Sequence, residues 1–445
     1  MNIKKLNKSL LKKICLLALM IYITNFFITY TYADENKLTS TDSNSQEQTQ
    51  QIEVPEKLEL LSKADILLDA KTGNILYENK ADEQLYPAST TKLMTAILTM
   101  ENCQLTDEIT VKAEWLKGIP RSYTIADLRA GETFTVDQLM HVLLIPSAND
   151  AANVLACHMS GSIDEFANKM NEKAKEIGCT NTHFVNPSGV HDDNHYSTAH
   201  DMALIGLYAC KFDTITEYAK ILNYDLPNRP DGKERKFSAT NTLLNPKHKY
   251  YYEYATGLKT GYTEKAKSCI VATAKKDDIE LLCVVLGGDK TEDRKSEREL
   301  DCKTLFDYGF NYFEYKNICN LGESIDISNT EEIPEYLKNQ NLIYSDSLNL
   351  LVQKNKELKP TIHFDSEKQL PIYKNSVVGN ITYQNNGKDY TVYILTSEDI
   401  LPAYSGYASI ALYALAVVLV VIIAVVVIKR KKKKPARYYK HSFYL

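Results

Sequence analysis

The stretch PASTTKLMTA, from Pro87 to Ala96, decides how the fold of this chain is interpreted. Its proline, serine and threonines lead into apolar residues at helical spacing, which predicts the start of a helix. A serine at such a position usually caps the helix by accepting a hydrogen bond from a backbone N–H group. Ser89 and Lys92 are three residues apart, however, so on a helix the lysine amine can reach the serine hydroxyl. A cap needs no such lysine, and the pair is therefore a candidate for chemistry.

The two ends of the 445-residue chain differ from its middle. Residues 1–33 have a basic start, an apolar segment and a small residue at the expected cut, which predicts a secretory signal peptide; an uncleaved N-terminal anchor is the alternative. A polar, flexible spacer follows at 34–53. At the other end, Ala408–Ile428 carries no charge and predicts a transmembrane helix followed by a basic tail at 429–445. We therefore expect a single-pass protein of the cell membrane, with an extracytoplasmic catalytic domain and a cytoplasmic C-terminus.

The charge of the exported body argues against nucleic acid as a partner. The whole chain has a formal net charge of −5, but the signal peptide and tail together hold 13 of the 52 basic residues and no acidic ones. The remainder therefore carries a net charge of −18, which would repel a phosphate backbone. Of the nine cysteines, eight lie outside the signal peptide and none forms a C-x-x-C pair, so neither a metal site of that kind nor a particular disulfide is predicted.

Hydrophobic patterns divide the exported body into two domains. Residues 54–318 begin and end with strand-like pairs, and helical periodicity lies between them, which predicts an α/β domain with an antiparallel sheet flanked by helices. The strand pairs are Ala64–Ala70 with Asn74–Glu78 and Ser268–Ala274 with Glu280–Leu286, and the helices are Ser89–Glu101, Val136–Leu144 and Ala151–Met159. Residues 321–400 predict a β-rich domain with a hairpin turn at Asn386-Gly387. No cluster of nucleophiles or metal ligands occurs in that second domain, so we expect a spacer or docking role for it.

Three short motifs occur in one order inside the larger domain: S-x-x-K at Ser89–Lys92, S-x-N at Ser147–Asn149 and K-T-G at Lys259–Gly261. Each motif alone is weak evidence, because each has a second copy elsewhere, at Ser9–Lys12, Ser347–Asn349 and Lys71–Gly73. Only the first set is predicted to open a helix, lie between two helices and lead into the sheet. That ordered combination is the signature of penicillin-binding proteins and serine β-lactamases.

With its flanking segments, the chain resembles a low-molecular-mass penicillin-binding protein, a serine-type D-alanyl-D-alanine carboxypeptidase. The resemblance covers about residues 54–288 and is carried, in family order, by LDAKTGNILYEN, PASTTKLMTA, LLIPSANDAANVLA, THFVNPSGVHDDNHYSTAHDMA and ATGLKTGYT. It implies a penicillin-binding-protein/β-lactamase-like fold and removal of the C-terminal D-alanine from peptidoglycan stem pentapeptides through a serine acyl-enzyme. It also implies inhibition by β-lactam antibiotics, and neither a metal nor a cofactor.

The residues of the three motifs suit acyl transfer. A serine hydroxyl needs a base, and lysine can be that base only when burial or another cation lowers its pKa. Ser89 is therefore the predicted nucleophile and Lys92 the general base, while Lys259 adds a positive charge and binds the substrate carboxylate. Ser147 is predicted to link the two lysines and relay a proton, and Asn149 to orient Lys92 and the substrate amide.

The remaining predicted residues bind the substrate. Thr260 would help Lys259 hold the carboxylate, and Gly261 would let the substrate backbone approach the strand closely. By resemblance to the family, the backbone N–H groups of Ser89 and Tyr262 form the oxyanion hole.

A metal site is a weaker alternative for one segment of the chain. His191, His195 and His200, with Asp192 and Asp193, have spacings that suit a helix face, but the glycine and Asp-Asp-Asn run favour a loop. The resemblance implies a structural role for this segment.

Three other functions stay open beside the carboxypeptidase. A class A β-lactamase would need a glutamate in an E-x-x-L-N segment after Asn149, and none follows. A D,D-endopeptidase acting on cross-linked peptides is compatible with every motif. A catalytically silent penicillin-binding scaffold is disfavoured because all the polar side chains are present. One departure from the family pattern, Ala148 where many relatives carry glycine, does not touch the reacting groups.

Overall fold

The computed structural model describes residues 54–120, 122–288, 297–328, 330, 332–366, 368–402 and 404–431. The predicted signal peptide, the predicted spacer and the part of the tail beyond residue 431 lie outside these residues.

The larger domain is built on a five-stranded antiparallel sheet with the strand order β2-β1-β9-β8-β7. Its strands are β1 (Ala64–Asp69), β2 (Ile75–Asn79), β7 (Ala255–Thr263), β8 (Lys267–Lys276) and β9 (Ile279–Gly288). β1 pairs with β9, so the two predicted hairpins meet in one sheet. The predicted antiparallel sheet is thereby confirmed, and β7 lies at one of its edges.

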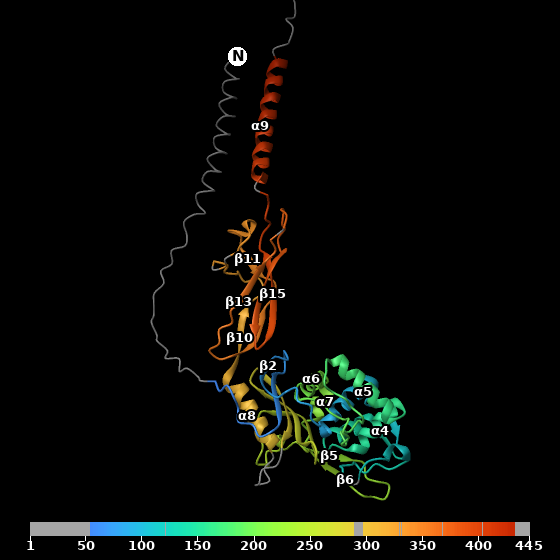
Figure 1. The fold of residues 1–445 in the computed structure, drawn as a ribbon. Coiled ribbons are helices and arrows are strands. Elements are labelled where there is room, and N and C mark those ends of the chain that lie inside the picture. Colours follow the sequence, from blue (N-terminus) through green and yellow to red (C-terminus); the bar gives the residue numbers. More distant parts are fainter. Residues whose placement is uncertain are drawn as a thin grey trace, which may run out of the picture. The chain divides into compact units, whose positions relative to one another are not determined.

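Both faces of this sheet are buried under helices (Figure 1). Side chains of β9 alternate between two apolar cores, as the two-residue period of a strand requires: Leu282 and Val284 pack toward one, Cys283 and Val285 toward the other. The first core contains α2 (Lys92–Asn102), α3 (Val136–Leu144), α4 (Asn149–Ser160), α5 (Ile163–Ile177), α6 (Ala199–Ala209) and α7 (Asp213–Tyr218). The second core is covered by α8 (Glu297–Tyr312). The observed α/β architecture is the predicted one.

The predicted helix at Ser89–Glu101 has two parts. It begins as a 3₁₀ turn, η1 (Ala88–Thr91), and continues as α2. α3 has the predicted bounds, and its first turn is closed by a reciprocal cap between Thr135 and Gln138. Smaller elements complete the domain: β3 (Glu108–Thr110), η2 (Ala113–Leu116), β4 (Thr133–Thr135), β5 (Asn223–Leu226), β6 (Arg235–Ser238) and η3 (Thr242–Leu244).

The second domain is β-rich, as predicted. β10 (Phe313–Cys319) pairs with β12 (Leu348–Gln353), and a four-stranded sheet has the order β11-β15-β14-β13. The strands of that sheet are β11 (Leu342–Tyr344), β13 (Pro360–Phe364), β14 (Val377–Asn385) and β15 (Lys388–Thr396), and η4 (Glu335–Leu337) precedes them. The hairpin turn between β14 and β15 is at Asn386-Gly387, where both φ angles are positive, as a two-residue turn of this kind requires.

A final helix, α9 (Tyr404–Lys431), contains the predicted membrane span Ala408–Ile428. Its side chains at 410–426 are exposed. In the part of the chain that the structure describes, no helix combines the length and the apolar character needed to cross a membrane. The transmembrane anchor therefore stays a prediction.

Candidate active site

The start of α2 brings the serine and lysine of the S-x-x-K motif into contact. Lys92 Nζ lies 3.0 Å from Ser89 Oγ, 2.9 Å from Asn149 Oδ1 and 2.7 Å from the carbonyl oxygen of Ser188. The Lys92 side chain is fully buried, whereas Ser89 is half-buried at the cavity surface. An amine surrounded by three oxygen atoms is thus presented to a hydroxyl that a substrate can reach.

The surroundings of Lys92 favour its uncharged form. Burial lowers the pKa of Lys92 well below its usual value, and the nearby positive charge of Lys259 lowers it further, while Asp150 opposes both effects. A neutral amine at hydrogen-bond distance from a hydroxyl can accept its proton. The geometry therefore suits general-base activation of Ser89.

The S-x-N motif connects α3 to α4. Asn149 opens α4, and its backbone N–H and Nδ2 both donate to the carbonyl oxygen of Thr124, at 2.9 and 2.8 Å. The predicted contact of Asn149 with Lys92 is present. Ser147 has a φ angle of +70°, and its buried Oγ has no hydrogen-bond partner among the described residues. Its predicted role as a link between the two lysines stays a prediction.

The K-T-G motif lies within the edge strand β7, not in a turn before it. Lys259 is buried, and burial together with the positive charge of Arg298 lowers its pKa to about 7. Its Nζ donates to the carbonyl oxygen of Thr260 at 3.0 Å. Thr260 Oγ1 is 2.6 Å from Thr240 Oγ1, and both threonines line the cavity next to the strand that carries the buried lysine. This combination of one cation and two hydroxyls suits a carboxylate.

Gly261 sets the distance between β7 and the nucleophile. A Cβ atom at this position would lie 2.8 Å from the backbone nitrogen of Ser89 and 3.1 Å from the carbonyl oxygen of Pro87. Arg298, at the start of α8, holds the other side of the strand by donating from Nη1 to the carbonyl oxygen of Gly261 at 3.0 Å. The next residue, Tyr262, exposes 48% of its surface at the mouth of the cavity.

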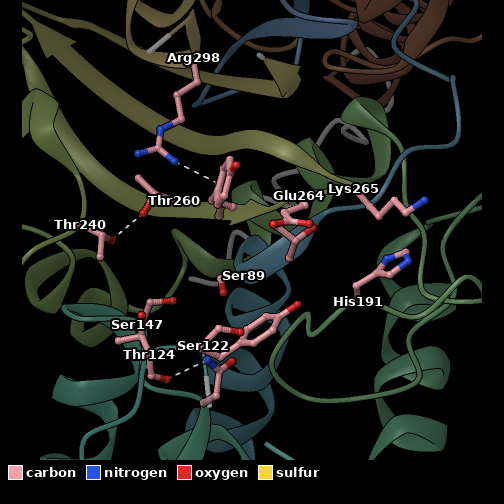
Figure 2. Close-up of a pocket in the computed structure, with 15 residues that line it drawn as sticks. Ser89, Ser122, Thr124, Ser147, His191, Thr240, Thr260, Glu264, Lys265 and Arg298 are labelled. Carbon is pink, nitrogen blue, oxygen red and sulfur yellow. Dashed lines mark hydrogen bonds between the residues drawn. The ribbon is translucent and has the colours of Figure 1, made fainter. Parts of the chain in front are cut away.

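Ser89 and residues of the other two motifs line a cavity of about 720 Å³ (Figure 2), whereas Lys92 and Lys259 are buried behind its surface. Ser89 faces it between β7 and the segment at 122–124, and seven chain segments contribute polar groups. Its lining residues are Ser89, Ser122, Tyr123, Thr124, Ser147, Asn149, His191, Thr240, Thr260, Gly261, Tyr262, Thr263, Glu264, Lys265 and Arg298. Because β7 is an edge strand, an extended peptide in the cavity can pair with it. We refer below to residues 123–128 as the wall loop.

Sequence reasoning missed several contributors to this cavity, among them Thr124, Thr240 and Arg298. None lies in a motif, and each reaches the site through a loop or helix remote from it in sequence. Thr124 acts through its backbone carbonyl, which any residue supplies. No sequence signal could therefore have identified it.

The histidines considered for a metal have separate partners. His195 is buried and contacts Thr91 Oγ1 at 2.9 Å through Nε2, while its Nδ1 accepts from the backbone N–H of Val185 at 3.2 Å. Burial lowers the pKa of His195 to about 3, so the ring is neutral at pH 7. His191 pairs with Asp193 and His200 with Asp82. Among the described residues, no group of three or more histidine, cysteine or acidic side chains is placed to hold a metal ion.

Ser89 at the cavity surface, the buried Lys92 beside it and the buried Lys259 on the edge strand of this sheet define a serine hydrolase of the penicillin-binding-protein/β-lactamase-like class. Residues 48–290 match the family model described as D-alanyl-D-alanine carboxypeptidase, peptidase S11, and residues 313–404 match the C-terminal domain of penicillin-binding protein 5. The first match spans more than half of the chain. The chain belongs to the D-alanyl-D-alanine carboxypeptidase family of serine peptidases, which confirms the resemblance found in its motifs.

Relatives and solved structures agree with this family. D-alanyl-D-alanine carboxypeptidase DacF of Bacillus subtilis is 30% identical over 335 residues, which are 74% of this chain and 82% of that protein. DacC of Escherichia coli is 32% identical over 348 residues, 74% of this chain and 81% of that protein. The crystal structure of penicillin binding protein 5 from Haemophilus influenzae aligns with a TM-score of 0.62 and 26% identity, covering 78% of this chain and 99% of that one.

Proposed function

We propose that this protein removes the terminal D-alanine from the stem pentapeptide of peptidoglycan, with Ser89 as the nucleophile. The observation that carries the proposal is the contact between the fully buried Lys92 Nζ and Ser89 Oγ, 3.0 Å apart. Burial lowers the pKa of the amine well below its usual value and so favours its uncharged form, and the hydroxyl opens onto a cavity that can hold an extended peptide.

In the acylation step, Lys92 takes the hydroxyl proton as Ser89 Oγ attacks the carbonyl carbon between the two terminal D-alanine residues. The carbonyl oxygen gains negative charge, which the backbone N–H groups of Ser89 and Tyr262 would stabilise. Lys259 and Thr260 would bind the C-terminal carboxylate of the substrate, and that new negative charge favours the protonated form of Lys259.

Collapse of the tetrahedral intermediate breaks the peptide bond. The departing D-alanine amine takes a proton, for which Ser147 is the proposed relay, and an ester remains on Ser89. Water then attacks the ester and gives a proton to Lys92. Lys92 returns a proton to Ser89 Oγ as the ester bond breaks and the shortened peptide leaves. A β-lactam ring would acylate Ser89 by the same attack, but its leaving group stays attached to the acyl-enzyme.

We also propose that the chain is anchored in the cell membrane through Ala408–Ile428, with its catalytic domain outside and the basic tail in the cytoplasm. Support comes from the 21 uncharged residues and the lysine-rich flank that follows them. The full-length protein should stay in the membrane fraction after an alkaline carbonate wash, whereas a chain ending at Pro402 should be released. Release of the full-length protein would refute the anchor.

Labelling with a fluorescent penicillin tests the nucleophile. The wild-type protein should form one covalent adduct, and Ser89→Ala should form none, because the substitution removes the hydroxyl that contacts Lys92 Nζ. Lys259→Ala should label much more slowly. The second K-T-G sequence supplies a matched control, since Lys71→Ala should label at the wild-type rate. Adduct formation on Ser89→Ala would refute the assignment.

Product analysis separates the carboxypeptidase from its alternatives. Incubation with a pentapeptide ending in D-Ala-D-Ala should release free D-alanine, and this release should be lost in Ser89→Ala. Rapid turnover of a β-lactam without D-alanine release would identify a β-lactamase, and cleavage of cross-linked dimers in preference to pentapeptide would identify an endopeptidase. Acylation without turnover of any of these substrates would identify a silent scaffold.

A further inference from the structure

The wall loop is fastened to the start of α4, where Asn149 and Asp150 lie side by side. Asn149 donates twice to the carbonyl oxygen of Thr124. The buried carboxylate of Asp150 accepts from the backbone N–H groups of Ala126 at 2.8 Å and Leu128 at 3.0 Å. The wall loop therefore makes four hydrogen bonds with the first two residues of α4. One of them holds the Asn149 side chain that contacts Lys92.

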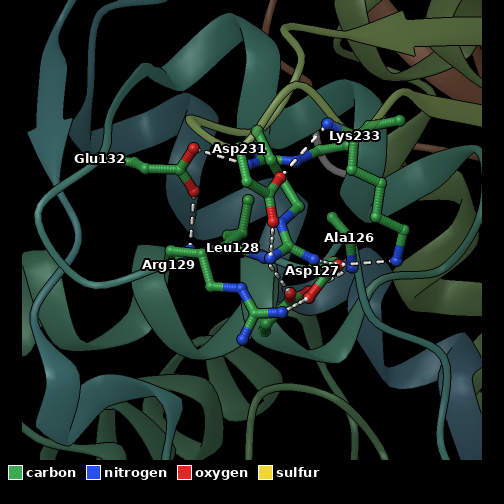
Figure 3. A network of polar contacts seen from close by, with 10 residues as sticks. Ala126, Asp127, Leu128, Arg129, Glu132, Asp231 and Lys233 are labelled. Carbon is green, nitrogen blue, oxygen red and sulfur yellow. Dashed lines mark hydrogen bonds and ion pairs between the residues drawn. The ribbon is translucent and has the colours of Figure 1, made fainter.

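Between these two anchored amides, the carboxylate of Asp127 contacts a group of cations (Figure 3). Arg129 Nη2 lies 2.6 Å from Asp127 Oδ1, and Arg229 Nη1 and Lys233 Nζ lie 3.0 and 3.2 Å from Oδ2. The φ angle of Asp127 is +59°, a conformation that aspartate and asparagine adopt more readily than most residues. The wall loop thus contacts α4 through the backbone amides on either side of Asp127, and it contacts the cations through the Asp127 side chain.

Arg229 and Lys233 come from the turn between β5 and β6, which is not part of the wall loop. That turn is ordered by its own bonds: Arg229 N–H donates to the Lys233 carbonyl oxygen at 2.9 Å, and the Arg229 guanidinium pairs with Asp231 at 2.5 Å. A second bridge lies nearby, where buried Arg235 donates to Glu132 at 2.5 Å. The hairpin therefore presents three cations to two acidic residues at or after the wall loop.

The strand β6 of the same hairpin is followed closely by another residue that lines the cavity. After β6, the backbone N–H of Thr240 donates to the Ile145 carbonyl oxygen at 3.2 Å, and Thr240 Oγ1 contacts Thr260 Oγ1 at 2.6 Å. Thr124 and Thr240 both line the cavity. The ion pairs at Asp127 consequently join two chain segments that each contribute a residue to the cavity.

We propose that Asp127, with Arg229 and Lys233, is a clamp that positions Asn149 against Lys92 by holding the wall loop to the β5–β6 hairpin. This inference rests on the proposed function, because the position of Asn149 matters only if Lys92 activates Ser89 for acylation. Asp127 does not touch the reacting atoms and is a positioning residue. When the clamp is lost, the loop moves away, the Thr124 carbonyl no longer fixes the Asn149 amide, and the Asn149 Oδ1 contact with Lys92 Nζ lengthens.

Asp127→Asn is the direct test. Asparagine tolerates the positive φ angle, so the substitution removes the charge without straining the turn. We expect the second-order rate constant for acylation by a fluorescent penicillin to fall about tenfold, since small displacements of positioned groups have effects of that order or larger. The matched control is Glu234→Gln, which removes an exposed ion pair with Lys236 (2.8 Å) close to the same hairpin turn and should leave acylation unchanged.

Three readouts distinguish positioning by charge from a general structural effect. Arg229→Lys should keep most of the acylation rate, whereas Arg229→Gln should lose about as much as Asp127→Asn. The double variant Asp127→Asn/Arg229→Gln should be no slower than either single variant, because both remove the same contact. Arg129 and Lys233 are more than half exposed, so salt should screen their attraction to Asp127. In 1 M NaCl the acylation rate of the wild type should therefore fall toward that of Asp127→Asn, whereas the rate of Asp127→Asn should change little.

The inference is wrong if Asp127→Asn acylates within twofold of the wild type, if Glu234→Gln is equally slow, or if the two losses add in the double variant. Its failure is distinct from failure of the proposed function. A wild-type protein that forms no serine-dependent adduct refutes the proposed function, whereas an active wild type with an unaffected Asp127→Asn refutes only the clamp.

Discussion

Replacing Gly261 by alanine should disable the proposed oxyanion hole without removing any of the proposed catalytic side chains. The new Cβ would lie 2.8 Å from the Ser89 backbone nitrogen and 3.0 Å from the Ala88 Cβ. Ordinary van der Waals contact begins at 3.4 Å, so β7 and η1 must separate by about 0.6 Å. A hydrogen bond of ~2.9 Å lengthened by that amount reaches ~3.5 Å and is effectively lost. Loss of one oxyanion donor costs about 10²–10³ in rate, or about 3–4 kcal/mol of transition-state stabilisation.

Stopped-flow acylation by a fluorescent penicillin and release of D-alanine from a pentapeptide measure this effect. Both rates should fall together in Gly261→Ala, because the oxyanion forms in both reactions. Gly178→Ala is the control: this residue ends α5 with a φ angle of +102°, and its Cβ would meet nothing nearer than 4.0 Å. It should lower stability by about 1 kcal/mol and leave both rates unchanged. A folded Gly261→Ala protein that acylates within threefold of the wild type would refute the reasoning.

Three further predictions concern pH and metal ions. Because the pKa of Lys259 in the free protein is about 7 and its charged form binds the carboxylate, kcat/KM for a pentapeptide should fall as pH rises through about 7, and a substrate ending in D-alaninamide should not show this fall. Burial raises the pKa of Asp65 to about 7, so the folded state keeps a proton that the unfolded state loses above its ordinary pKa of 3.8. Stability measured by urea unfolding should therefore decrease between about pH 4 and 7, by up to about 1.4 kcal/mol per pH unit, and Asp65→Asn should flatten that slope; an unchanged slope would contradict the assignment. A chelator should leave acylation unchanged, since both ring nitrogens of His195 already have protein partners, and loss of activity restored by zinc would show otherwise.

Local patterns were sufficient for part of the core, although α5, α6, α7 and α8 were not among the predicted helices. The spacing of apolar residues predicted α3 with its exact bounds, and Asn386-Gly387 predicted the β14–β15 turn, because each signal depends on neighbours in sequence. Positive φ angles at Ala88 and Ser147 were not predictable from residue type, since neither alanine nor serine favours that conformation. The helix start at Ser89 was accordingly predicted as regular, whereas it is a 3₁₀ turn.

The order of the motifs around PASTTKLMTA determined the family and the candidate nucleophile, because these residues had to be present for the chemistry. The burial of the lysines and the full lining of the cavity were determined only by the tertiary structure. It buried Lys92 completely, placed Lys259 within an edge strand, and brought the Thr124 carbonyl, Thr240 and Arg298 to the same cavity. A pKa depends on solvent exclusion and on charges from distant parts of the chain, and a backbone carbonyl has no signature in sequence. Those contributions exist only once the chain has folded.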